Sequence, residues 1–398
     1  MISRVRYRMR RPRRSRAPKA AAIAGLAALA GVIGVGGWAA HDRQAGPEHA
    51  ELTSTPKITK VSLPAPPAPP ALQEKIEQLA ERYREPVGIA ITDVSARWTA
   101  QVAGDEVFPQ QSVSKLWVAL AVMHAVDRGQ LRLDQPVTLT KEDRSVFYQP
   151  ITAKIRGPNG YATSVYELLK YQLTESDNAA NDKLIAEVGG GEAVSRVMAE
   201  KGLEGLGRGE TERDLQTRAA GLTWKPEYGL TWVWKAAREE LPETVRDQAL
   251  EAYLANPGDG AKPAAITNAL AALHRGELLS PQSTEAMLDL MAQCRTGSSR
   301  LRAGLPSGWS IAHKTGTGPD WRGASVGIND VGLITAPDGR TYAVAVMLRQ
   351  TRHPVGARQA LMQAVARAVV DYWRTTPKGL SVPDRRVASL GSAPETAR

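Results

Sequence analysis

Segments typical of β-strands lie near both ends of this chain, and helical segments occupy the stretch between them. Alternating or apolar runs predict an early hairpin at residues 86–94 and 97–104, and later strands at 308–318, 323–339 and 340–350. The turn residues Pro337–Gly339 separate the last two runs. This order predicts an α/β chain of the α+β kind, in which a sheet built from both ends of the chain carries an inserted all-helical domain.

Apolar periodicity predicts a helix at each boundary of this domain and a third helix after the early hairpin. These helices are expected at residues 72–83, 112–129 and about 354–373. The expected catalytic domain, residues 72–376, therefore has a sheet part at 72–104 and 300–376 and a helical part at 105–299. Residues 377–398 have the polar, turn-rich composition of a loose tail.

The positive charge of the chain belongs to its N-terminus. The formal net charge is +10, and residues 1–19 contain nine Lys and Arg and no acid, which leaves +1 for the remainder. A basic groove on the folded part is therefore not supported, and we expect no nucleic-acid partner.

An uncharged segment of membrane-spanning length, residues 20–40, follows the basic run. This arrangement predicts a signal or anchor over residues 1–40, with the rest of the chain exported to the periplasm or secreted. Gly37 and Ala39 fit a small-x-small cleavage pattern, whereas the Pro/Ala-rich linker at 41–71 fits a domain tethered to the inner membrane. Both alternatives stay open, and membrane contact is expected only through residues 20–40 if they are not cleaved.

Cysteine and histidine content argue against disulfides and metal. Cys294 is the single cysteine, which excludes an intramolecular disulfide, and we expect it to be a small buried apolar side chain. The six histidines form no HxH or HExxH pair. We therefore predict no structural or catalytic metal.

A serine and a lysine begin the apolar segment at 112–129. Ser112 and Lys115 form S-x-x-K, and residues three apart share one face of a helix. Lys115 can accept or return a proton, and the helix N-terminus favours the negative charge that develops when the serine attacks. The motif alone is weak, since one or two copies are expected by chance in a chain of about this length.

Two further triplets follow in order. Ser176, Asp177 and Asn178 form S-D-N, residue types that also cap helices. Lys314, Thr315 and Gly316 form K-T-G on a predicted strand, where a glycine lets a ligand approach the backbone closely; Thr317 follows. Each triplet should occur by chance in about one such chain in ten or fewer, so the ordered set indicates catalysis at Ser176 and Asn178, with Asp177 fastening the loop.

Together with S-x-x-K, these motifs make residues 72–376 resemble the class A serine β-lactamases, relatives of the penicillin-binding proteins. The resemblance implies an antiparallel five-stranded sheet flanked by helices, with no cofactor. Ser112 would be the nucleophile and Lys115 its proton partner, while Ser176 would pass a proton to the ring nitrogen. Asn178 would orient the side-chain amide of the substrate, and its carboxylate would bind at the K-T-G strand through Lys314, Thr315 and Thr317.

The family pattern also contains E-x-x-L-N, which appears here as E-x-x-L-Q. Glu212 would be the general base that activates the deacylating water, and Gln216 replaces the amide residue that helps to hold this water. Glu210 is the alternative base, at a position where relatives commonly have an Arg that pins the loop. Tyr148, in the segment "FYQP", is expected either to stack on the substrate at the pocket rim or to pack within its loop.

The spacing departs from the family pattern after Glu212. Lys314 follows 102 positions later, about thirty more than usual, and residues 220–254 look like a helical insert. Its three tryptophans, Trp224, Trp232 and Trp234, could line an enlarged pocket, although packing within the insert is the simpler expectation.

These features predict a monomeric serine β-lactamase whose substrate is a small molecule, a β-lactam. The enzyme would hydrolyse the lactam amide through an acyl-enzyme on Ser112, which water activated by Glu212 then releases. One alternative is a penicillin-binding protein or D-Ala-D-Ala carboxypeptidase acting on peptidoglycan peptides. A second is a non-catalytic wall-binding homologue. Glu212 argues against the first alternative, and the intact set of catalytic side chains argues against the second.

Overall fold

The computed structural model describes residues 65–207 and 210–376. The predicted signal or anchor, most of the linker and the C-terminal tail lie outside these residues. Within the described ranges, no helix combines the length and the apolar character needed to cross a membrane.

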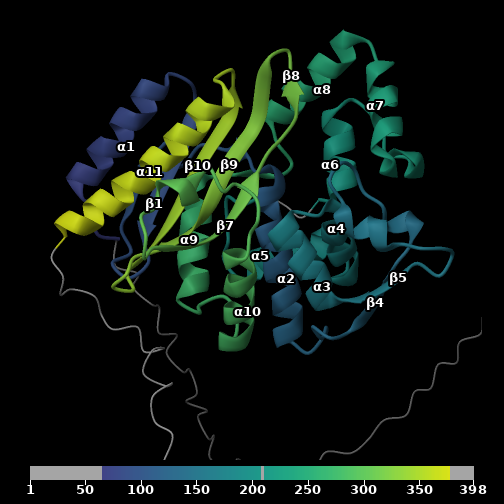
Figure 1. Ribbon diagram of the computed structural model, residues 1–398, viewed down its shortest axis with the longest axis horizontal. Coiled ribbons are helices and arrows are strands. Elements are labelled where there is room, and N and C mark those ends of the chain that lie inside the picture. Colours follow the sequence, from purple (N-terminus) through teal and green to yellow (C-terminus); the bar gives the residue numbers. More distant parts are fainter. Residues whose placement is uncertain (1–64, 208–209, 377–398) are drawn as a thin grey trace, which may run out of the picture. The chain divides into compact units, whose positions relative to one another are not determined.

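The two ends of the domain meet in one antiparallel sheet, as the sequence predicted (Figure 1). Its strand order is β2(Thr99–Val102), β1(Val87–Asp93), β10(Thr341–Thr351), β9(Ala324–Thr335) and β7(Ser310–Gly316), and the short β8(Asp320–Trp321) pairs with β9. In the central register Ala90 lies opposite Ala345, and Val331 lies opposite both Ala345 and Lys314. The K-T-G triplet therefore ends an edge strand of this sheet.

Helices cover both faces of the sheet because its strands alternate between two apolar surfaces. On β10, Val344 and Val346 point into the core shared with α1(Pro70–Tyr83) and α11(Val355–Thr375). Ala343 and Ala345 point into the opposite core, beneath α9(Pro263–His274). A close approach on this second face requires glycine in β1, because a Cβ on Gly88 would lie 2.6 Å from Cγ of Pro263.

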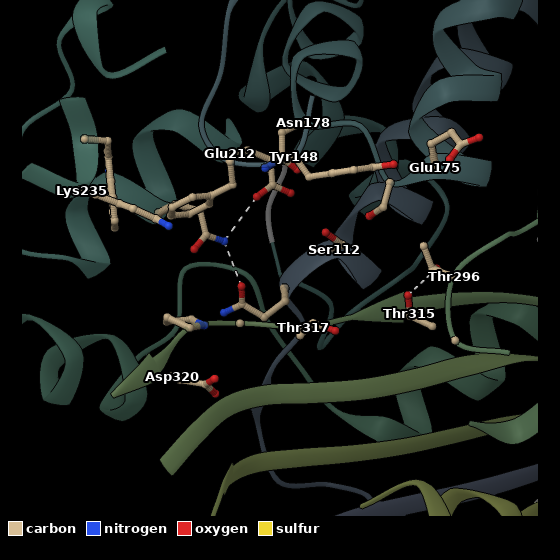
Figure 2. Close-up of a pocket in the computed structure, with 18 of the residues that line it drawn as sticks. Ser112, Tyr148, Glu175, Asn178, Glu212, Lys235, Thr296, Thr315, Thr317 and Asp320 are labelled. Atoms are coloured by element: carbon tan, nitrogen blue, oxygen red, sulfur yellow. Dashed lines mark hydrogen bonds between the residues drawn. The ribbon is translucent and has the colours of Figure 1, made fainter. Parts of the chain in front are cut away.

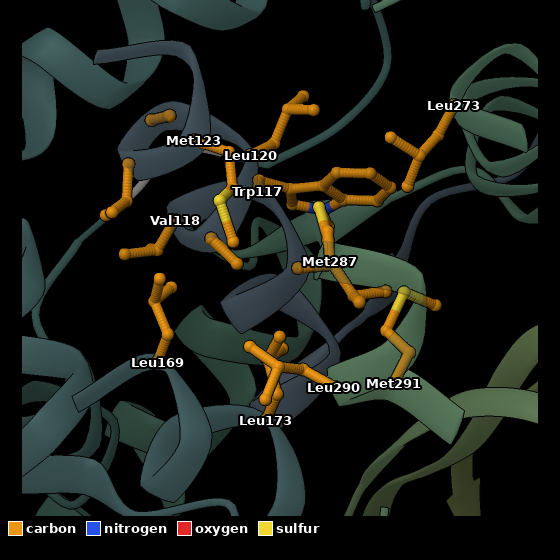
Figure 3. Close-up of a cluster of buried hydrophobic side chains, with 14 of the residues drawn as sticks. Trp117, Val118, Leu120, Met123, Leu169, Leu173, Leu273, Met287, Leu290 and Met291 are labelled. Atoms are coloured by element: carbon orange, nitrogen blue, oxygen red, sulfur yellow. The ribbon is translucent and has the colours of Figure 1, made fainter. Parts of the chain in front are cut away.

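The helical part surrounds α2(Lys115–Asp127), which is buried on nearly every side (Figure 3). Trp117, Leu120 and Met123 of α2 pack against Leu173, Met287 and Leu290 in this core. The other helices of this part are α3(Val165–Lys170), α4(Asn178–Glu187), α5(Gly191–Glu200) and α10(Pro281–Ala292), and β4(Pro136–Leu139) pairs with β5(Tyr161–Ser164).

The start of α2 differs from the sequence prediction. Ser112 lies in a 3₁₀ turn, Gln111–Ser114, and the α-helix begins only at Lys115. The turn is tight because Gln111 adopts a left-handed φ of 53°, with its N–H held 2.5 Å from Oδ2 of Asp259. Side chains three apart are eclipsed in a 3₁₀ turn, so Ser112 and Lys115 still project together.

The segment predicted as a helical insert contains two helices. They are α7(Thr231–Glu239) and α8(Glu243–Ala255), which follow α6(Glu212–Ala219). The chain then returns to the body of the domain, where β6(Gly260–Ala261) pairs with β3(Phe108–Pro109).

Candidate active site

Lys115 connects three of the predicted catalytic side chains. Its side chain is fully buried, and Nζ donates hydrogen bonds to Oγ of Ser112 at 2.8 Å and to Oδ1 of Asn178 at 2.9 Å. It also forms an ion pair with Oε1 of Glu212. An ammonium group has three N–H donors, so these three acceptors saturate it. The predicted nucleophile, a lysine and a carboxylate thus form one continuous path for a proton.

Ser176 and Lys314 form a second pair. Nζ of Lys314 donates to Oγ of Ser176 at 2.9 Å and to the carbonyl of Thr315 at 3.0 Å. Complete burial, together with the nearby charge of Lys115, lowers the pKa of Lys314 to about 7. Ser176 follows a π-helical turn in a left-handed conformation, φ 63°, which costs free energy in a non-glycine residue and is enriched at active sites.

Asp177 fastens the loop between this serine and Asn178. It is buried and caps α4 by accepting from the N–H groups of Ala180 at 2.9 Å and Ile151 at 2.7 Å. Burial raises the pKa of Asp177 to about 6. The amide of Asn178 is fixed as well, because Nδ2 donates to the carbonyl of Val146 at 2.8 Å while Oδ1 accepts from Lys115.

Glu212 is positioned by a residue that the sequence analysis missed. The fully buried Asp182 accepts from the backbone N–H of Glu212 at 2.6 Å and from Oγ of Ser145 at 2.6 Å. Burial, together with the charge of Glu212, raises the pKa of Asp182 to about 6. Asp182 lies one helical turn after Asn178, a spacing that could have drawn attention to it.

Gln216 and Gln111 link Glu212 to the insert by hydrogen bonds. Nε2 of Gln216 donates to Oε1 of Gln111 at 2.9 Å and, more weakly, to Oε2 of Glu212 at 3.3 Å. Nε2 of Gln111 donates to the hydroxyl of Tyr253 at 2.6 Å, and Tyr253 donates to Asp259 at 2.9 Å. Burial and then the charge of Glu212 raise the pKa of Asp259 to about 7.

The K-T-G strand forms the opposite wall. Oγ1 of Thr315 lies 2.6 Å from Oγ1 of Thr296, and Arg300 donates to the hydroxyl of Thr317 at 2.6 Å and to the carbonyl of Gly316 at 3.0 Å. A side chain at Gly316 cannot be accommodated, since its Cβ would lie 2.2 Å from the carbonyl of Gln110. The sequence analysis did not single out Arg300 or Thr296, because neither belongs to a motif.

A cavity of about 780 Å³ joins these groups. Figure 2 shows Ser112 between two ends of it: Thr296 and Glu175 lie at one end, and Lys235 and Asp320 lie at the other. Tyr148 also lines the cavity and is 56% exposed, while its carbonyl accepts from the N–H of Asn178 at 3.0 Å. Among the described residues, no group of three or more His, Cys, Asp and Glu side chains could hold a metal ion.

A family model described as "Beta-lactamase enzyme family" matches residues 71–373, about three quarters of the chain. The chain belongs to the β-lactamase enzyme family. It is 26% identical to β-lactamase VEB-1 of Pseudomonas aeruginosa, over 75% of this chain and 89% of that protein. It is also 26% identical to the extended-spectrum β-lactamase PER-1 of the same organism, over 76% of this chain and 87% of that protein.

Solved structures agree with this assignment. A β-lactamase from Chitinophaga pinensis is 28% identical with a TM-score of 0.61, covering 76% of this chain and 99% of its own. An ancestral class A β-lactamase is 32% identical with a TM-score of 0.59, at the same coverage. The predicted relationship to class A enzymes and the predicted fold class are confirmed.

In this member of the β-lactamase family, an ion pair fastens the region around Glu212. Glu210, the alternative base, lies outside the cavity lining and forms a two-point ion pair with Arg218, in which Nη2 lies 2.8 Å from Oε2. This pair joins the two ends of a segment that includes Glu212 and Gln216. The acid at position 210 therefore has a structural partner within the same segment.

The tryptophans of the insert have separate environments. Trp234 is buried and lines the cavity, where Phe147 packs edge-on against it at a centroid distance of 4.7 Å. Trp224 packs against Tyr228 within the insert, and Trp232 is 71% exposed. One of the three thus contributes to the cavity, and Lys235, Arg238 and Glu239 of the same helix join it there.

Proposed function

We propose that this enzyme is a serine β-lactamase that opens the lactam amide through a covalent acyl-enzyme on Ser112. The observation that supports this most strongly is the contact of Lys115 with Ser112, Asn178 and Glu212 at once. A serine needs a base to attack at neutral pH, and Lys115 can serve once it has passed a proton to Glu212, because it is within hydrogen-bond distance of both residues.

In acylation, Oγ of Ser112 bonds to the lactam carbonyl carbon and its proton passes to the Lys115–Glu212 pair. The backbone N–H groups of Ser112 and Thr317 would stabilise the oxyanion, each contributing about two to three factors of ten in rate. When the C–N bond breaks, the ring nitrogen takes a proton from Ser176, which Lys314 can replenish across 2.9 Å.

Substrate binding would use the opposite wall. The carboxylate of the lactam would accept hydrogen bonds from Thr315 and Thr317, with the charges of Lys314 and Arg300 behind them. The amide of Asn178 would contact the acyl side-chain amide. Gly316 lets this strand lie directly against the loop before Ser112, because a Cβ there would meet the backbone carbonyl of Gln110.

In deacylation, Glu212 would take a proton from a water molecule whose oxygen attacks the ester carbon, and Ser112 would leave with its proton restored. Gln216 would position Glu212 through the contact at 3.3 Å. This step separates the proposal from a penicillin-binding protein or carboxypeptidase, in which the penicilloyl ester persists. A non-catalytic homologue would form no ester.

The test is intact-mass spectrometry of the purified domain, sampled over time after mixing with benzylpenicillin. An adduct that appears and disappears while hydrolysed penicillin accumulates supports the proposal, and Ser112→Ala should form none. A persistent adduct would favour the penicillin-binding-protein alternative, and labelling of Ser112→Ala would exclude Ser112 as the nucleophile.

We further propose an exported domain, periplasmic or secreted, because a basic segment followed by an apolar one is the pattern of an export signal or membrane anchor.

A further inference from the structure

Two arginines of the insert contact one tryptophan of the sheet, and neither forms an ion pair with an acid within the described part of the chain. The guanidinium carbons of Arg238 and Arg246 each lie 4.7 Å from the ring centroid of Trp321. Both side chains are half-buried, and the Nε atom of each is buried with no hydrogen-bond partner among the described residues. Arg322, by contrast, forms an ion pair with Asp247 at 2.8 Å.

Partial burial makes the charge of Arg238 less favourable. Burial lowers the pKa of Arg238, and the charge of Arg246 lowers it further. Stacking on Trp321 satisfies the faces of the guanidinium planes, whereas the N–H groups at their edges need oxygen acceptors. A partly buried charge without such an acceptor favours the binding of an anion.

Only one of the two arginines reaches the catalytic cavity. Arg238 lines it, together with its neighbours Trp234 and Lys235 on α7, whereas Arg246 does not. Lys235 and Arg238 are three residues apart and therefore share a face of this helix. The cavity thus has cations both here and at the K-T-G strand.

The two cationic regions would receive different parts of one substrate. Figure 2 shows Lys235 and Thr296 on opposite sides of Ser112. With the lactam carboxylate at Thr315 and Thr317 and the side-chain amide at Asn178, the acyl side chain extends toward α7. Asp320 and Glu239 also line this end of the cavity, and the charge of Glu239 partly offsets the lowering of the Arg238 pKa. Among the described residues neither acid forms an ion pair with Arg238, and Asp320 accepts a hydrogen bond from Oγ of Ser325.

We propose that Arg238, assisted by Lys235, is an anion-binding subsite for β-lactams whose acyl side chain carries a carboxylate. The inference rests on the proposed function, since it names a preferred substrate class for the same cavity. The bidentate geometry of a guanidinium matches a carboxylate, and Trp234 supplies an apolar surface for the connecting chain.

The test uses two penicillins that differ in one charge. Adipoyl-6-aminopenicillanic acid ends in a carboxylate, and its side-chain methyl ester has the same chain without the charge. We expect the wild-type enzyme to have a kcat/KM about tenfold higher for the acid than for the ester, mainly through KM. Glutaryl and succinyl pairs should show how far the carboxylate must reach.

The variants Arg238→Gln and Arg246→Gln form a matched pair, because both lose the same stacking on Trp321 and only the first changes the cavity lining. Arg238→Gln should reduce the acid-over-ester ratio about tenfold, and Arg246→Gln should leave it within about twofold. Turnover of the ester reports on the catalytic machinery separately, so its absence in the wild type would overturn the proposed function instead.

Equal wild-type kcat/KM for acid and ester would overturn the subsite, and this result needs no variant to fold. The same conclusion would follow if the ratio fell equally in both variants, since the effect would then come from the packing of the insert. Thermal melting of each variant shows whether the insert still packs on Trp321.

Discussion

The side-chain amides of Gln111 and Gln216 are joined by a hydrogen bond of 2.9 Å. Gln111 precedes Ser112, the proposed nucleophile, and Gln216 is on the helix that begins with Glu212. The insert sets which of the two glutamines donates. The hydroxyl of Tyr253 gives its proton to Asp259, so its oxygen accepts from the amide N–H of Gln111. The side-chain carbonyl of Gln111 then accepts from Gln216. The insert therefore determines which atom of Gln216 faces the proposed general base.

Tyr253→Phe should slow deacylation about tenfold while leaving acylation within about twofold. Removal of the hydroxyl leaves a buried amide donor of Gln111 without its acceptor, so the orientation of Gln216 is no longer fixed. Rapid-quench mass spectrometry measures both rates as the growth and decay of the penicilloyl adduct.

Tyr228→Phe is the control for this change, because Tyr228 is a buried tyrosine of the same insert that is not in the hydrogen-bonded chain. An equal loss of deacylation in Tyr228→Phe, or unchanged deacylation in Tyr253→Phe, would contradict the positioning role.

Lys314 should make substrate binding depend on pH. Its pKa is lowered to about 7, mainly by burial, so the free enzyme loses this charge as the pH rises through 7. The KM for benzylpenicillin should therefore rise about tenfold between pH 7 and 9, as a charge-assisted contact to its carboxylate weakens. Lys314→Arg, which stays charged, should flatten this profile; a flat profile in the wild type would remove Lys314 from carboxylate recognition.

Asp259 should make stability depend on pH in the opposite sense to an ordinary carboxylate. Its folded pKa is raised, mainly by burial, from 3.8 to about 7. Between these values the folded state holds a proton that the unfolded state has released, so the free energy of unfolding should fall as the pH rises from about 4 to 7. Urea denaturation across this range should give a shallower fall for Asp259→Asn, and parallel curves would show that Asp259 does not titrate in this way.

Gly316→Ala should impair acylation and destabilise the fold. The added Cβ would meet the backbone carbonyl of Gln110 at 2.2 Å, and a backbone group cannot move aside as a flexible side chain can. Overpacking of this kind costs on the order of 2 kcal/mol. Gly339→Ala is the comparison, because a Cβ there meets nothing within 4 Å and only its φ of 87° opposes the change; an equally active Gly316→Ala would show that the strand can shift.

Local spacing was enough to predict the groups that lie close together in the chain. Ser112 and Lys115 are three residues apart, so they share a face whether the backbone is α-helical or 3₁₀, and the error in helix type did not alter the pair. Strand alternation likewise predicted a sheet built from both ends, since each run needs a partner to bury its apolar face.

The supporting residues could not be predicted because their roles arise only from tertiary contacts. Asp259 holds the backbone of Gln111 across 148 positions, and no repeat or motif connects the two. Arg300 looks like any surface arginine in the sequence, yet its guanidinium ties Thr317 to the strand. From the sequence, Arg238 would be assigned to the polar, solvent-exposed side of a helix. Its position in the cavity wall depends on how the insert packs on Trp321.

The most direct test of the account compares Glu212→Gln with Glu210→Gln by rapid-quench intact-mass spectrometry with benzylpenicillin. Glu212 contacts Lys115 and Gln216, whereas Glu210 pairs with Arg218 outside the cavity lining. We predict that Glu212→Gln accumulates the penicilloyl adduct on Ser112 and retains it for at least about a hundred times longer than the wild type. Glu210→Gln should clear it at nearly the wild-type rate. A longer-lived adduct in Glu210→Gln than in Glu212→Gln would contradict the assignment of Glu212 as the general base.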